Sequence, residues 1–470
     1  MKSRPVRQAL GLAKNAGTAF MIALSLTASA PGAMLRAGVA KVDITPPPGL
    51  PMYGYFDRIK NNQLATGTLD PLEARALVLE AGDRRVALVT LDLGRTFGAA
   101  SLARLRQVTR EQSGISDLIV TASHTHAGPN ILDEYPGGQA LVWEDVAIQK
   151  IGKGIAEACE HLNEARLGAS YGSVYIGYNR RRANPDGTVT MLWTNPTKVP
   201  TAPADPTVSV LRIDTAAGKP LAVLVNYACH PVVFGPDNLR YSADYVGVMR
   251  RTVEDEFRGE PLCLFLQGAD GDINPYYATT PFAQGAIEKR DWTGKQLGRE
   301  AARVAKSIRT EAASEASLRF AEDVLPVRVR WDPEKFREGL LRAFGSRIFE
   351  DHADLFVDGP RYELELAVTT LLVNGQIAFV GMPGEPFVDF QMDWRARSPV
   401  RHAFFVGYTN GYFDYFPTIQ AATEGGYGAA DSDTYVAVGA AERMLDHALV
   451  RVYEMLGKLS DLPEDLKAPQ

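Results

Sequence analysis

The chain has 470 residues and a formal net charge of −6, with 46% apolar and 23% charged residues. Apolar content at this level supports a large buried core, which excludes an intrinsically disordered or collagen-like chain. The acidic balance argues against nucleic acid as a partner. The length allows one large domain or two to three ordinary ones, and composition leaves the oligomeric state open.

The first 33 residues have the layout of a secretory signal peptide. Four basic residues and no acidic one precede an apolar run at 19–28, and small residues follow as far as Ala33. We expect residues 1–33 to be removed and the protein to be secreted or periplasmic, with an uncleaved N-terminal anchor as the alternative. Removal takes four positive charges from a chain at −6 and leaves −10. No second apolar run of about 18 residues follows, so we expect at most peripheral membrane contact.

Strand-like and helix-like periodicities alternate along the first part of the remaining chain. A strand is predicted at 36–45, and two β-rich runs joined by Gly82-Asp83 read as a hairpin over 73–93. Apolar spacing predicts a helix at 99–112, a buried strand at 117–122 and a long helix at 144–163.

The same alternation continues to the C-terminus. Strands are predicted at 207–213, 220–228, 262–267, 318–331, 362–373 and 376–381, and helices at 243–257, 285–312 and 433–457. The pattern indicates an α/β fold. We expect one large catalytic domain over 34–458, with mixed sheets flanked by helices and a metal site at the carboxyl ends of strands. Residues 459–470 lack periodicity and are predicted to be a flexible tail.

Three cysteines, Cys159, Cys229 and Cys263, are too few for a disulfide scaffold. Their neighbours are apolar, and an odd count leaves one cysteine unpaired even if a disulfide forms. We interpret all three as buried free thiols.

The strongest local signal is the sequence Ser-His-Thr-His-Ala-Gly-Pro at 123–129, directly after a predicted buried strand. In extended backbone, residues i and i+2 point to the same side. His124 and His126 would then converge on one point, as zinc ligands do. The competing interpretation is a pair of polar loop histidines.

Three further apolar strands end in polar groups. His230 follows 223–229 and is the natural third ligand, although a core or capping histidine is the alternative. The strand at 262–267 runs into Asp270, Asp272 and Asn274, which an ordinary Asp/Gly turn would also explain. The strand at 377–381 leads to Glu385, and a carboxylate commonly completes a catalytic histidine site for zinc. Four such strand ends together favour a metal centre.

The region 408–417, with 424–427 after it, is rich in aromatic residues and glycine and has no clear period. It is interpreted either as a packed surface loop or as the wall of a pocket.

These stretches together resemble the neutral/alkaline, non-lysosomal ceramidase family, over its catalytic N-terminal domain only. The matching segments occur in order along the chain, at 38–45, 52–55, 123–129, 179–180, 226–231, 271–275, 383–385 and 410–427. The resemblance implies hydrolysis of the amide bond of N-acylsphingosines with one zinc ion per chain.

Carried onto this sequence, the resemblance implies a specific set of site residues. The zinc ligands would be His124, His230, Glu385 and Tyr415. His126 would then lie beside the metal as a proton-transfer or oxyanion group rather than as a ligand. Arg180 and Tyr427 would line the reacting centre.

Two features depart from the family pattern. The family nucleophile is the serine of a Gly-Asp-x-Ser-Pro motif, and the matching residue here is Asn274, whose amide cannot serve as that nucleophile. The family also usually carries a C-terminal immunoglobulin-like domain, and this chain ends soon after its last predicted helix. We therefore expect zinc-activated water to attack, with His126 or Asp272 as general acid or base and Asn274 donating to the oxyanion.

The sequence leaves three functions open. The first is a zinc amidohydrolase acting on N-acyl lipids. The second is a zinc hydrolase on the same scaffold that cleaves a small ester, lactone or glycoside. The third is a non-catalytic metal-binding protein. Segments 276–284 and 331–358 are candidate walls of a lipid groove, whereas Trp193 and Tyr53 would equally suit a sugar.

Overall fold

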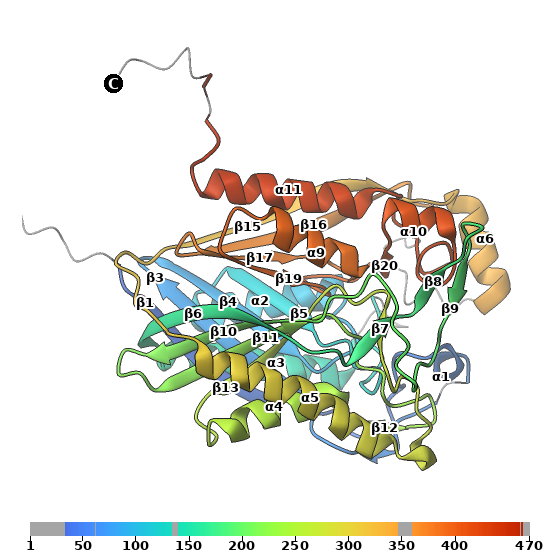
Figure 1. Cartoon of the computed structure of the whole chain (residues 1–470), viewed down its shortest axis with the longest axis horizontal. Helices are drawn as coiled ribbons and strands as arrows, with labels where there is room; N and C mark the ends of the chain where they lie inside the picture. The colour runs from blue at the N-terminus through green and yellow to red at the C-terminus, as the bar shows by residue number, and fades with distance from the viewer. Residues whose placement is uncertain (1–32, 62, 134–139, 346–359, 461, 464–470) are drawn as a thin grey trace, which may run out of the picture. The chain divides into compact units, whose positions relative to one another are not determined.

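The computed structural model describes residues 33–61, 63–133, 140–345, 360–460 and 462–463, and its core is built on two larger β-sheets with helices around them (Figure 1). The predicted signal peptide therefore lies, apart from Ala33, outside the described residues. Most of the predicted tail lies outside them too.

One mixed sheet of eight strands has the order β13-β11-β10-β6-β1-β3-β4-β5. Its strands are β1 (Leu35–Asp43), β3 (Glu73–Ala81), β4 (Arg84–Leu91), β5 (Asp117–Ala122), β6 (Asn163–Ser173), β10 (Thr207–Thr215), β11 (Pro220–Tyr227) and β13 (Leu262–Gln267). β4 runs parallel to β5 and β11 runs parallel to β13, while the other neighbours are antiparallel. The hairpin predicted at 73–93 is confirmed, with Ala81 opposite Arg84 across its turn.

A second sheet of four strands, in the order β15-β16-β17-β19, lies against the first. It contains β15 (Leu318–Arg328), β16 (Glu363–Val373), β17 (Ile377–Gly381) and β19 (His402–Val406). One apolar cluster holds side chains of both sheets, among them Leu79, Leu224, Phe379 and Phe404. The two sheets therefore pack face to face and share a core.

Helices cover the outer face of each sheet, which gives four layers (Figure 1). α2 (Ala99–Ser113), α3 (Val142–Glu160), α4 (Asp244–Glu256) and α5 (Ala286–Ser307) cover the large sheet. α9 (Val388–Arg397) and α11 (Ala440–Met455) cover the small one. In β3, Leu77 and Leu79 face the other sheet while Ala76 and Val78 face the helices. Burial on both faces explains the near-continuous apolar strands of the sequence.

Short elements lie around one end of the two sheets (Figure 1). They are α1 (Phe56–Lys60), β2 (Gly67–Thr68), β7 (Gly177–Asn179), β8 (Arg181–Ala183), β9 (Val189–Met191), β12 (Arg240–Tyr241), β14 (Ile273–Pro275), η1 (Phe282–Gln284), α6 (Pro333–Phe344), β18 (Glu385–Pro386), β20 (Tyr415–Phe416) and α10 (Ile419–Glu424). The predicted α/β fold with mixed sheets flanked by helices is thus confirmed.

Some predicted boundaries are wrong. The helix predicted at 433–457 begins at Ala440, where Gly439 in the left-handed region (φ 83°) starts it. The helix predicted at 144–163 ends at Glu160, because β6 begins at Asn163. Strand β6 itself was not predicted, since its alternation of small and polar residues lacks an apolar run. In the segment 331–358, α6 forms and 346–359 lie outside the described residues.

The cysteine prediction holds for two of three residues. Cys229 and Cys263 are buried free thiols, whereas Cys159 is partly exposed near the end of α3.

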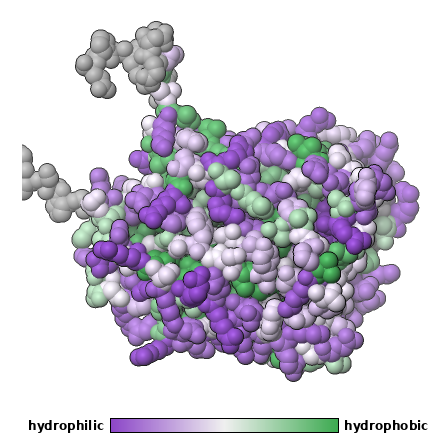
Figure 2. All heavy atoms as spheres, viewed as in Figure 1, coloured by the Kyte–Doolittle hydropathy of each residue, from purple (hydrophilic) through white to green (hydrophobic). Residues whose placement is uncertain are grey.

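Polar residues cover most of the face shown in Figure 2, and apolar residues appear there in small scattered groups. Within the described ranges, every helix is too short or too polar to cross a membrane.

Candidate metal centre

The carboxyl ends of β5, β11, β13, β17 and β19 meet at one rim of the two sheets. Backbone hydrogen bonds join the loops that leave them: Gly268 N donates to Tyr227 O at 2.9 Å, and Gly407 N donates to Gln267 O at 3.0 Å. A bridge between Thr121 and Thr409 links the end of β5 to the loop after β19. Side chains that follow these strands are therefore held close together.

Three histidines converge at this rim. The possible ligand atoms of His124, His126 and His230 all lie within 4.8 Å of one another. The Nε2 atoms of His124 and His126 are 3.0 Å apart. His124 and His230 are each only 1% exposed. These residues could hold a metal ion, as the sequence predicted.

The extended backbone predicted at the two neighbouring histidines is wrong, although their convergence is present. β5 ends at Ala122, and His124 has a φ of 66°, in the left-handed region rather than in extended backbone. The two imidazoles meet because the chain turns sharply after the strand. Gly54, with a φ of 101°, lets the preceding loop approach His126, since a Cβ there would lie 2.4 Å from the imidazole.

Hydrogen bonds fix the orientation of two of the imidazoles. His124 Nδ1 lies 2.6 Å from Gly94 O, and His230 Nδ1 lies 2.6 Å from Asp270 O. A carbonyl oxygen only accepts, so each Nδ1 carries the proton and each Nε2 presents a lone pair. This is the tautomer that a metal-binding histidine needs.

Glu385 completes the group from β18. Its Oε1 lies 3.5 Å from His124 Nε2, and its Oε2 lies 3.2 Å from His230 Nε2. Among the described residues, neither Glu385 Oε2 nor His230 Nε2 has a hydrogen-bond partner. Two buried acceptor atoms thus face each other, which is costly unless a cation lies between them. Imidazole nitrogens together with a carboxylate oxygen suit zinc.

The protonation states agree with this interpretation. Burial lowers the pKa of His124 to about 4, against the opposing charge of Glu385. Burial likewise holds the pKa of His126 well below its usual value, and His124 adds to the effect. Burial alone would raise the pKa of Glu385, but His124 and His230 bring it well below its ordinary range. The site therefore combines neutral imidazoles at His124 and His126 with an ionised carboxylate at Glu385.

A second group of side chains lies beside the histidines and Glu385, namely Tyr415, Tyr427 and Arg180. β18 runs parallel to β20 with Glu385 opposite Tyr415, so these two side chains lie on the same side of the pair. The Arg180 guanidinium lies 5.4 Å from the Tyr415 ring centroid and 5.0 Å from that of Tyr427. Burial raises the pKa of Tyr415 well above its usual value, with Glu385 adding to the effect and a hydrogen bond to Arg180 opposing it.

Asn274 lies on β14 and Asp272 directly before it, next to Arg180. Arg180 Nη1 donates to Asn274 Oδ1 at 3.4 Å. The two oxygens of Asp272 accept from Asn179 Nδ2 at 2.6 Å and from Val388 N at 2.9 Å. Burial raises the pKa of Asp272 to about 6. Its carboxylate therefore anchors the start of α9, and a role as acid or base stays a prediction.

Three tyrosines contact the ligand set; sequence reasoning assigned no individual role to Tyr408 or Tyr412 and named Tyr53 only as a candidate sugar contact. Tyr412 OH donates to Glu385 Oε1 at 2.5 Å, and Tyr53 OH donates to Tyr412 OH at 3.1 Å. Tyr408 stacks on His124 with ring centroids 4.4 Å apart. Two of them belong to the aromatic stretch at 408–417, which was the available signal. Residues 410–413 line a cavity, as the pocket-wall interpretation predicted, whereas 414–417 and 424–427 are not part of that lining.

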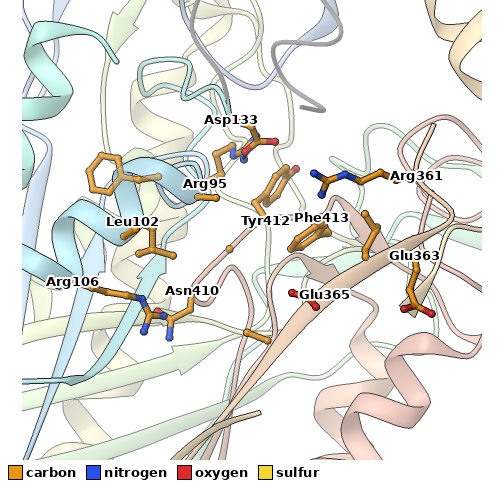
Figure 3. Close-up of a pocket in the computed structure, with 16 residues that line it drawn as sticks. Arg95, Leu102, Arg106, Asp133, Arg361, Glu363, Glu365, Asn410, Tyr412 and Phe413 are labelled. Carbon is orange, nitrogen blue, oxygen red and sulfur yellow. Dashed lines mark hydrogen bonds and ion pairs between the residues drawn. The ribbon is translucent and has the colours of Figure 1, made fainter. Parts of the chain in front are cut away.

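That cavity lies between α2, the start of β16 and the loop after β19, and has a volume of about 570 Å³. Its apolar lining includes Phe97, Leu102 and Phe413, and its charged lining includes Arg95 and Arg361. Figure 3 shows Tyr412 and Phe413 between the side bearing Arg95 and Leu102 and the side bearing Arg361. The segment 276–284 contributes nothing to this lining.

Two solved structures share the fold, namely a neutral ceramidase from Pseudomonas aeruginosa and a ceramidase complexed with C2. Each has a TM-score of 0.70 and 20% sequence identity, over 93% of this chain and 77% of the other chain.

The sequence makes the assignment specific. The neutral/alkaline non-lysosomal ceramidase family, in its N-terminal region, matches residues 35–286, which is more than half of the chain. The chain belongs to this family and is a ceramidase-like hydrolase. The predicted resemblance is thereby confirmed.

Proposed function

We propose that the chain is a secreted or periplasmic zinc-dependent amidohydrolase that cleaves the amide bond of N-acylsphingosine-type lipids. The observation that carries the proposal is the pair of facing acceptor atoms, Glu385 Oε2 and His230 Nε2, within a cluster of buried histidines. Such a cluster exceeds what a structural zinc site needs, because structural sites are closed and commonly rich in cysteine.

His124, His230 and Glu385 would hold the metal, with Tyr415 as the fourth protein ligand. A bound zinc ion would polarise the substrate carbonyl and lower the pKa of a bound water to about 7. His126 lies beside His124 and has a buried Nδ1 without a hydrogen-bond partner in the described ranges. We assign the transfer of protons between water and the leaving amine to His126.

Asn274 and Arg180 support the developing negative charge. Because Asn274 Oδ1 accepts from Arg180, the amide nitrogen of Asn274 points away from the guanidinium. Tyr178 lies opposite Asn274 across the β7–β14 pair. The amide nitrogen of Asn274 has two N–H groups, which would donate to the oxyanion of the substrate. Tyr427 stacks near Arg180 and would border the substrate.

The substrate assignment follows the family. One of the two similar structures is a ceramidase complexed with C2, which is consistent with a lipid-like ligand in this fold. In this chain we place part of the substrate in the cavity beside Tyr412, since its volume of about 570 Å³ suits a ligand pocket.

Two observations favour a second candidate function, hydrolysis of a small ester, lactone or glycoside. Asn274 replaces the family serine, and Trp193 is 50% exposed beside Tyr427, with ring centroids 5.4 Å apart. A half-exposed tryptophan packed against the less exposed Tyr427 near the reacting centre would suit a flat ring as well as a lipid chain.

The deciding experiment is an assay of the zinc-loaded mature protein against a labelled ceramide and a panel of esters, lactones and glycosides. Ceramide turnover well above a His124→Ala control supports the first function. Turnover of another panel member without ceramide turnover supports the second. Zinc binding without any turnover would mean a non-catalytic metal-binding protein and would end the proposal.

A further inference from the structure

Tyr412 touches the proposed metal ligands without belonging to them. Its hydroxyl donates to Glu385 Oε1 at 2.5 Å, and Tyr53 OH donates to that hydroxyl at 3.1 Å. The other carboxylate oxygen, Oε2, keeps no hydrogen-bond partner in the described part of the chain. The two oxygens of Glu385 thus have different surroundings, and Tyr412 accounts for the difference.

The loop that carries Tyr412 is rigidly placed. Asn410, two residues earlier, has a φ of 54° and holds the loop against β5. Val120 N donates to Asn410 Oδ1 at 2.8 Å, and Asn410 Nδ2 donates to Leu118 O at 2.9 Å. β5 is the strand that precedes His124. The position of Tyr412 is therefore fixed relative to a second proposed ligand as well as to Glu385.

We propose that Tyr412 is a positioning residue for Glu385. Its hydroxyl occupies Oε1 of that carboxylate and leaves Oε2 as the single oxygen that faces the metal. Tyr53 acts through Tyr412, because its hydroxyl reaches Glu385 only by way of the Tyr412 hydroxyl. Hydrogen bonds to metal-binding carboxylates orient the ligand and tune its affinity. The inference depends on the proposed function only in that a metal binds here.

The test is the zinc dissociation constant, measured by competition with a chromophoric chelator on the full mature chain. Tyr412→Phe keeps the ring that lies 4.7 Å from the Arg95 guanidinium and removes only the hydroxyl. We expect a rise in the dissociation constant of about 10–100-fold. A purely structural role would lower stability equally with and without zinc and would leave this constant unchanged.

Two further variants make the test specific. Tyr53→Phe should weaken zinc binding less, and should add nothing in the Tyr412→Phe background because both act on the same oxygen. It also carries the test if Tyr412→Phe fails to fold. Tyr171→Phe is the matched control, since its hydroxyl accepts from Ala403 N near the opposite end of β19.

The outcomes separate this inference from the proposed function. The inference alone is overturned if Tyr412→Phe binds zinc within twofold of the wild-type affinity while the wild type binds zinc and turns over substrate. Additive effects of the two tyrosine variants also contradict it. A wild-type protein that binds no zinc overturns both the inference and the proposed function.

Discussion

Replacing Glu385 by glutamine separates the effect of this residue on zinc binding from its effect on the stability of the metal-free protein. The change removes the charge and keeps the shape of the side chain. Without metal, Glu385 Oε2 and His230 Nε2 face each other at 3.2 Å as two acceptors. The glutamine amide can turn its N–H toward His230 Nε2 and form a hydrogen bond there. The change should therefore spare the metal-free protein while it damages metal binding.

The magnitude follows from the contacts. The new hydrogen bond contributes about 1 kcal/mol, and the bond from Tyr412 loses a similar amount because its acceptor becomes neutral. We expect the metal-free variant to unfold within about 1 kcal/mol of the metal-free wild type. Zinc at 100 times its wild-type dissociation constant stabilises the wild type by about 2.7 kcal/mol. If affinity falls by about 100-fold, the same zinc concentration gives the variant only about 0.4 kcal/mol.

Denaturant unfolding at 25 °C, with EDTA or with zinc at that fixed concentration, measures both quantities. Glu365→Gln is the matched control, because Glu365 is an exposed glutamate on β16 that lines the neighbouring cavity. A Glu385→Gln variant that keeps the full zinc stabilisation would refute the assignment of Glu385 as a ligand. A metal-free variant that loses more than about 2 kcal/mol would show that Glu385 has another partner.

Three other predictions test the surroundings of the site. Asn274→Ala should slow turnover by about 10²–10³-fold and leave the zinc dissociation constant unchanged; unchanged turnover would contradict an oxyanion role. Ala103→Trp, which fills the cavity from α2, should raise KM for an N-acyl lipid at least tenfold, whereas Ala100→Trp on the same helix, outside the lining, should not. Burial raises the pKa of Asp244 to about 6, so the folded state binds this proton more tightly than the unfolded chain does. Stability should fall by about 1.4 kcal/mol per unit as pH rises from 4 to 6, and Asp244→Asn should remove this contribution in pH-dependent urea unfolding.

The order of strands and helices was readable from the sequence because both faces of the sheets are buried. A run such as Leu-Ile-Val within β5 is apolar throughout, and its length distinguishes it from a helix. β6 and α9 carry no such signal, since β6 contains small and polar residues and α9 has apolar residues on more than one side. Their positions follow from neighbours that lie far away along the chain.

The candidate ligands were readable for a different reason. His124, His230 and Glu385 each follow an apolar strand, and the carboxyl ends of such strands gather at one rim of a sheet, so sequence order predicted proximity. Tyr415, in contrast, came only from the family resemblance. The details that orient them were not readable. The left-handed turn at His124 and the contact of Tyr412 with Glu385 depend on how loops from both sheets meet. The spacing of residues within one segment does not predict how loops that are distant in the sequence contact each other.

The presence of Asn274 is compatible with an intact metal centre because the two depend on different parts of the structure. β14 pairs with β7 through its backbone, and His230 N donates to Ile273 O at 3.0 Å, so neither contact involves the side chain at 274. The imidazoles of His124 and His230 are oriented by backbone carbonyls of other loops. Exchange of a serine for asparagine would therefore remove a nucleophile and leave the ligand geometry in place. A hydrolase that retains this geometry needs another attacking group, and water activated at the proposed zinc site would meet that requirement.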